Sequence, residues 1–105
     1  TLGENIADLG GLNISYQALQ LALGGNEKPI EGFTPEQRFF LAYAHVWGQN
    51  IRDEEILRRT KVDVHSLGEF RVNGPLPNMP EFYKAFDVQE GDAMYLADEN
   101  RAVIW

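Results

Sequence analysis

Two carboxylates near the start of the chain have a spacing that suits a shared positive partner. Glu4 and Asp8 are four residues apart, and no basic residue precedes Lys28. On a helix their side chains would project from nearly the same face, one turn apart. The pair therefore predicts either a metal ion or a histidine as its partner, or a solvated helix N-terminus, where acidic residues are favoured anyway.

A second group of candidate residues lies in the segment 63–71, which contains His65 and Arg71. Loops on a rigid scaffold often hold functional groups, so this pair is interpreted either as functional or as a surface histidine with a charge-paired arginine. His45 lies in an apolar run, where a core or interface histidine is the simpler interpretation. The chain contains no HExxH, P-loop, GxGxxG or GxSxG pattern.

Helices are expected to position these residues, and the fold is predicted to be mainly α, a small bundle of about four helices. Apolar residues recur at helical spacing over residues 2–23, and Gly24 and Gly25 follow as a stop signal. Gly10 and Gly11 in the middle of this segment predict either a weak or broken helix, or close approach by another backbone. A second helix should begin at Thr34, the N-cap of a capping box completed by Gln37.

The second helix contains the run Phe39–Trp47, which is apolar almost all the way round. A helix of that kind is normally buried among neighbours on every side. The remaining helices are too short to surround it, which indicates that the chain is part of something larger. Apolar surface left uncovered in this way also predicts self-association, with Phe39, Tyr43 and Trp47 as contact candidates.

The remaining elements are predicted from capping and turn residues. Asp53 is the expected cap of a third helix, and Asn78 is the expected cap of a fourth over residues 79–86. Residues 65–77, with two glycines and two prolines, should form a structured loop. Residues 94–96 and 102–104 are expected to pair as a short C-terminal hairpin.

Composition excludes several classes of function. The 105-residue chain has a net charge of −7, which argues against nucleic acid and anionic membranes as partners. No apolar run approaches the roughly 18 residues that a membrane helix requires, so no membrane segment is expected in this chain. The absence of cysteine excludes disulfides and thiolate metal sites.

Three long blocks of this sequence resemble the neprilysin family of zinc metallopeptidases. They cover residues 3–12, 34–47 and 63–76, and residues 80–86 with the terminal Trp105 extend the match over essentially the whole chain. The resemblance implies that residues 1–105 are the C-terminal part of a zincin-type catalytic domain. The parent enzyme would then be a zinc endopeptidase that cleaves short peptides before apolar residues.

The resemblance also implies a role for each candidate residue. Glu4 matches the third zinc ligand, Asp8 matches a carboxylate that orients a ligating histidine, and His65 matches a hydrogen-bond donor to the developing oxyanion. Arg71 matches the residue that holds a substrate carbonyl. Val46 and Trp47 match part of the apolar pocket for the side chain after the cleaved bond.

The chain departs from the family pattern in ways that affect activity. HExxH, which would supply two zinc ligands and the general base, is missing, as is the family's substrate-positioning Asn-Ala segment. The isolated chain is therefore predicted to be inactive and to bind no zinc. The absence of a cysteine near the C-terminus resembles bacterial members of the family. The family resemblance implies a periplasmic, secreted or cell-envelope protein, whereas the absence of cysteine fits any compartment. The alternatives are a self-contained all-α interaction module and a pseudoenzyme that has lost its metal.

Overall fold

The computed structural model describes residues 2–48, 52–62 and 68–104. These residues form five α-helices, α1 (Leu2–Leu23), α2 (Pro35–Val46), α3 (Asp53–Val62), α4 (Gly68–Asn73) and α5 (Pro80–Phe86), and two short 3-10 helices, η1 (Leu76–Asn78) and η2 (Asp98–Asn100). Within these ranges there is no strand beyond one isolated bridge between Ile30 and Phe33. The prediction of a mainly α fold is confirmed.

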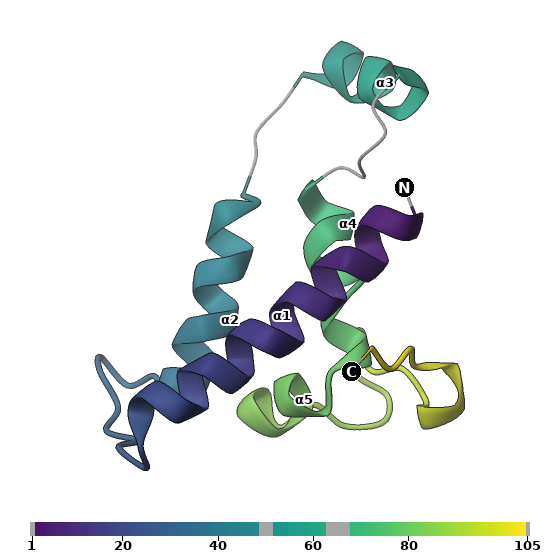
Figure 1. Ribbon diagram of the computed structural model, residues 1–105. Coiled ribbons are helices and arrows are strands. Elements are labelled where there is room, and N and C mark those ends of the chain that lie inside the picture. The colour runs from purple at the N-terminus through teal and green to yellow at the C-terminus, as the bar shows by residue number, and fades with distance from the viewer. Residues whose placement is uncertain (1, 49–51, 63–67, 105) are drawn as a thin grey trace.

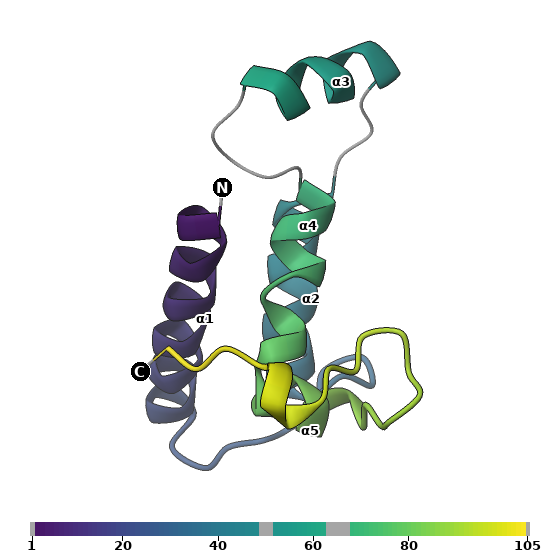
Figure 2. The same ribbon diagram turned by 90° about the vertical axis from the view of Figure 1, so that its right-hand side faces the viewer.

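The long helix α1 lies across the other helices of the bundle, whereas α3 lies apart from them (Figures 1 and 2). The predicted bounds of α1 are confirmed, and the helix continues unbroken through Gly10 and Gly11. Its apolar stripe is buried in the middle, where Leu9 and Leu12 are 2% and 5% exposed. No helix within the described residues is both long and apolar enough to cross a membrane.

The start of α2 agrees with the sequence prediction. The Gln37 N–H donates to Thr34 Oγ1 at 3.1 Å, and the Thr34 N–H donates to Gln37 Oε1 at 3.0 Å. The Gln37 side-chain amide also donates to the Ala85 carbonyl at 2.9 Å, which ties α2 to α5. Local capping and tertiary packing therefore use the same glutamine.

The core is small and lies where α1, α2, η1 and α5 meet. Phe40 is 2% exposed, and its ring contacts those of Phe82 and Tyr16 with centroids 5.5 and 5.8 Å apart. Leu41 and Val46 on the same helix are 43% and 71% exposed. Within the described residues the apolar surface of α2 is therefore not fully covered, as the length argument predicted. The buried core residues are Leu9, Leu12, Phe40, Leu76, Met79 and Phe82.

Two predicted helix caps are wrong. The carbonyl of Arg52 accepts the first helical hydrogen bond of α3, from Ile56 at 3.1 Å, so Asp53 lies within the first turn rather than at the cap. An acidic residue there still interacts favourably with the helix dipole. The cap residue of α5 is Met79, not Asn78. Asn78 instead accepts from the Ala102 N–H at 2.8 Å and holds the C-terminal tail.

The predicted loop over residues 65–77 and the C-terminal hairpin are also wrong within the described residues. The helix α4 and the start of η1 occupy residues that were expected to form the loop. The tail forms no hairpin, because side chains bind its backbone groups: the Leu96 N–H donates to the Tyr83 hydroxyl at 2.6 Å, and the Ile104 carbonyl accepts from Asn13 at 2.9 Å. The tail thus crosses from α5 to α1 (Figure 2).

Candidate functional site

The helix α1 carries both carboxylates that the sequence singled out. Glu4 and Asp8 are one turn apart on this continuous helix, so their Cα atoms lie on the same side of it. The side chain of Glu4 is not among those that the structure describes. The side chain of Asp8 is described, and only 15% of its surface is exposed. Asp8 is therefore not a solvated residue at a helix end.

Asp8 is paired with Arg71, which is 63 residues away in the sequence. Arg71 Nε donates to Asp8 Oδ2 and Arg71 Nη2 donates to Oδ1, both at 2.8 Å. This is the bidentate geometry that makes arginine–carboxylate pairs strong. Each side chain is 15% exposed, so water screens the pair less than it screens a surface ion pair. The pair joins α1 to α4.

Arg71 lies on α4 and not in a loop, which corrects the sequence prediction for this residue. Its guanidinium lies over the ring of Trp47 at 4.0 Å from the ring centroid. Trp47 is the C-cap residue of α2, so this contact joins α4 to α2. Arginine is well suited to such a position because its planar cation can stack on an aromatic ring and bind a carboxylate at once.

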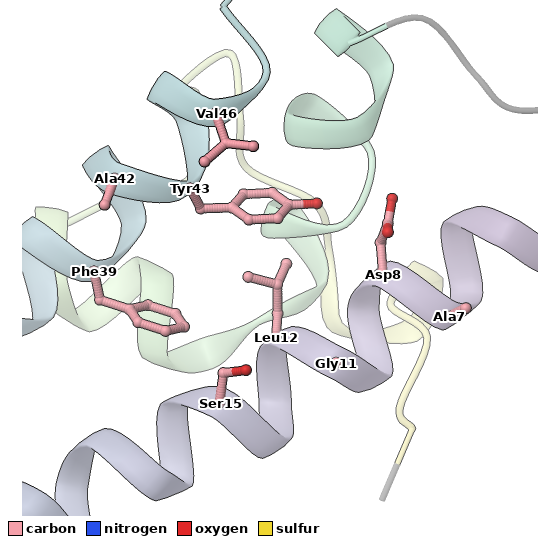
Figure 3. Close-up of a pocket in the computed structure, with 9 residues that line it drawn as sticks. All are labelled: Ala7, Asp8, Gly11, Leu12, Ser15, Phe39, Ala42, Tyr43 and Val46. Atoms are coloured by element: carbon pink, nitrogen blue, oxygen red, sulfur yellow. The ribbon is translucent and has the colours of Figure 1, made fainter.

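An apolar groove of about 440 Å³ lies between α1 and α2. Figure 3 shows Tyr43 and Val46 projecting from α2, and Asp8 and Leu12 from α1. A Cβ atom at Gly11 would meet no neighbouring atom of the described residues within 4 Å, so the groove is open at this point of α1 and no other backbone among them approaches Gly11 closely. The lining residues are Ala7, Asp8, Gly11, Leu12, Ser15, Phe39, Ala42, Tyr43 and Val46.

The two predicted pocket residues have different surroundings. Val46 lines the groove and is 71% exposed. Trp47 is partly buried beneath Arg71 and does not line the groove. Tyr43 was missed as a site residue. Its signal in the sequence was a phenol within an apolar run, because a buried tyrosine hydroxyl usually needs a hydrogen-bond partner.

The surroundings of Tyr43 make its hydroxyl harder to ionise. Burial raises the pKa of Tyr43 above its ordinary value of 10.0, and the negative charge of Asp8 raises this pKa further. The hydroxyl donates to the main-chain carbonyl of Arg71 at 2.9 Å. The carboxylate, the arginine, the indole and the phenol thus form one connected cluster from three helices.

Two histidines complete the set of sequence candidates. His65 lies outside the described residues. His45, near the C-terminal end of α2, is exposed. It is therefore not a core residue of this chain, and the alternative of an interface histidine stays a prediction. The described part of the chain has no group of three or more His, Cys, Asp or Glu residues that could hold a metal ion. Glu4 by itself would supply one ligand, whereas protein zinc sites use three or four.

Comparisons with known proteins cover almost the whole chain. The profile of peptidase family M13 matches residues 1–102. Human neprilysin is 41% identical over 109 aligned residues, which span 100% of this chain and 14% of neprilysin. Neprilysin-2 of Caenorhabditis elegans is 39% identical over 90% of the chain and 13% of its own length. The chain therefore spans only a small part of these relatives.

Solved structures agree with this match. The cryo-EM structure of the Mycobacterium tuberculosis zinc metalloprotease Zmp1 in its open state superposes with a TM-score of 0.92 and is 50% identical, covering 98% of this chain and 16% of that one. A chain of the Haemonchus galactose-containing glycoprotein complex gives a TM-score of 0.88 at 36% identity, covering 99% of this chain and 19% of that one.

Proposed function

The chain belongs to peptidase family M13 as a C-terminal segment, and we propose that it is the C-terminal part of the catalytic domain of a zinc endopeptidase. This enzyme would hydrolyse short peptides on the N-terminal side of apolar residues. The observation that carries the proposal is the ion pair of Asp8 with Arg71. This ion pair joins residues 3–12 to residues 63–76, two of the three blocks that resemble the neprilysin family, and it lies beside the apolar groove.

The metal-binding role falls to α1. Glu4 would be one ligand, and the part of the protein that carries HExxH would supply the others. Zinc bound in this way would provide Lewis-acid activation of a water molecule and of the peptide carbonyl. Asp8, one turn further along, would orient a ligating histidine, while its ion pair with Arg71 holds α1 against α4.

The substrate-binding role falls to residues on α2 and α4. Arg71 would donate hydrogen bonds to a main-chain carbonyl of the peptide, in an orientation fixed by Asp8 and by the ring of Trp47. Val46, at the exposed side of the groove, would contact the apolar side chain that follows the cleaved bond. His65 would stabilise negative charge on the carbonyl oxygen of the reacting peptide bond.

The family match over residues 1–102 favours this function over a self-contained interaction module, since the chain spans 14% of human neprilysin. A pseudoenzyme would belong to the same family and differ only in chemistry. The presence of HExxH in the rest of the protein would distinguish the two possibilities, because a working site needs those zinc ligands besides Glu4.

The test uses a longer protein that carries this segment together with HExxH. Glu4→Gln removes the charge of a metal ligand and should abolish zinc retention, measured by mass spectrometry of the purified protein. Asp8→Ala should retain zinc more weakly and lower kcat/KM by roughly 10- to 100-fold. Glu27→Gln, in the exposed turn after α1, is the matched control and should leave both quantities unchanged. Normal zinc content and normal rate in both site variants would contradict the assigned roles.

A further inference from the structure

The main-chain carbonyl of Arg71 lies at the end of α4, where the helix cannot satisfy it. In a continuing helix this carbonyl would accept from the N–H of residue 75. Residue 75 is proline, which has no N–H to donate. The hydroxyl of Tyr43 donates to this carbonyl at 2.9 Å. A side chain of α2 therefore replaces the missing helical hydrogen bond of the residue proposed to bind the substrate.

Tyr43 also contacts the aromatic ring that supports the Arg71 side chain. Its ring meets that of Trp47 edge to face, with centroids 6.4 Å apart. The guanidinium of Arg71 lies on the same indole at 4.0 Å. Tyr43 is thus connected to the main chain of Arg71 directly and to its side chain through Trp47.

We propose that Tyr43 is a positioning residue, which fixes Arg71 in the orientation needed to bind the peptide carbonyl. This inference rests on the proposed function, because it gives Tyr43 a role only through Arg71. Small displacements of a positioning group weaken substrate binding, since a hydrogen bond to a carbonyl depends steeply on distance and angle. The helical donor that would otherwise serve this carbonyl is absent, because residue 75 is proline.

The test is a double-mutant cycle in the full-length enzyme that carries this segment. Tyr43→Phe keeps the ring, which lines the groove, and removes only the hydroxyl. We expect KM to rise about 3- to 10-fold, as for the loss of one buried hydrogen bond, with kcat unchanged within about twofold. In an Arg71→Ala background, Tyr43→Phe should change KM no further, because the residue that it positions is gone.

Tyr16→Phe is the matched control. Tyr16 is another partly buried tyrosine of the bundle, and within the described residues its hydroxyl makes no hydrogen bond. This variant should leave KM and kcat unchanged. Replacing Tyr43 by 4-aminophenylalanine restores an N–H donor on the same ring and should return KM to within about twofold of the original value. Thermal unfolding of every variant checks that the fold is kept.

The possible outcomes separate this inference from the proposed function. If Arg71→Ala leaves KM unchanged, Arg71 does not bind substrate, and both the role assigned to it and the role of Tyr43 are overturned. If Arg71→Ala raises KM but Tyr43→Phe has no effect, or has an equal effect in both backgrounds, the substrate-binding role of Arg71 stands and the positioning role of Tyr43 is wrong.

Discussion

The ion pair between Asp8 and Arg71 should contribute far more to stability than the exposed ion pair on α3. The two pairs have nearly the same geometry: Arg58 donates to both carboxylate oxygens of Glu55, at 2.9 and 2.7 Å. They differ in burial, because the Asp8 and Arg71 side chains are each 15% exposed, whereas those of Arg58 and Glu55 are 61% and 33% exposed. They also differ in what they connect: the Asp8–Arg71 pair joins two helices, whereas the Glu55–Arg58 pair lies within α3.

Arg71→Met keeps an unbranched stem of similar length and removes the guanidinium. It leaves the carboxylate of Asp8 largely buried without its arginine partner, so we expect the free energy of unfolding to fall by about 2–4 kcal/mol. Arg58→Met removes an exposed pair spaced i, i+3 on one helix and should lower it by only about 0.3–0.5 kcal/mol. The comparison holds side-chain chemistry constant and varies burial.

Urea unfolding of the purified 105-residue chain, followed by tryptophan fluorescence, measures how much each of the two arginine variants lowers the free energy of unfolding. Added salt provides a second contrast: about 1 M NaCl should abolish the small effect of Arg58→Met and leave most of the effect of Arg71→Met. Asp8→Asn should cost less than Arg71→Met, because the amide oxygen still accepts from the arginine. Equal losses below about 0.5 kcal/mol for the two arginine variants would refute the reasoning that burial makes the Asp8 pair strong.

The isolated chain, incubated with zinc and quenched apolar peptides, should show no cleavage above buffer, and calorimetry should show no submicromolar one-to-one zinc site; turnover that a chelator abolishes would contradict this. Raising the pH through the ordinary tyrosine pKa of 10.0 should lower the free energy of unfolding, because burial raises the pKa of Tyr43 and of Tyr16 and the unfolded chain releases these protons first. The double variant Tyr16→Phe/Tyr43→Phe should lose less stability as the pH rises. An unchanged pH dependence would show that these two tyrosines are not its cause. Finally, Leu41 and Val46 leave apolar surface of α2 exposed, so analytical ultracentrifugation from about 10 to about 500 μM should show self-association, and a monomer throughout would disprove it.

Features that depend on neighbouring residues could be read from the sequence. The bounds of α1 follow from its apolar periodicity and from Gly24 and Gly25, and the capping box of α2 follows from Thr34 and Gln37. The family was likewise evident from three blocks of residues in the right order. Each of these signals acts over a few residues or is a property of the linear order itself, so no tertiary information is needed to recognise it.

The short helix α4 and the C-terminal tail could not be predicted in the same way. The two glycines and two prolines of residues 65–77 indicated a loop, yet six residues among them form a helix whose Arg71 is held by two other helices. Asn78 has the right type for a helix cap, but the tail offers its side chain a different donor, the N–H of Ala102. In both cases a distant partner outweighs the local preference.

In the candidate site, too, the sequence indicated the residues, and the tertiary structure determined their contacts. Residue types alone marked Asp8 and Arg71 as groups able to do chemistry, but neither composition nor spacing indicated that they bind each other. Their pairing depends on the tertiary arrangement that places α4 opposite α1, and the same arrangement brings Leu9 and Leu12 of α1 and Leu76 of η1 into one buried cluster. A buried charged side chain needs a partner of opposite charge, and the tertiary structure determines which residue lies close enough to be that partner.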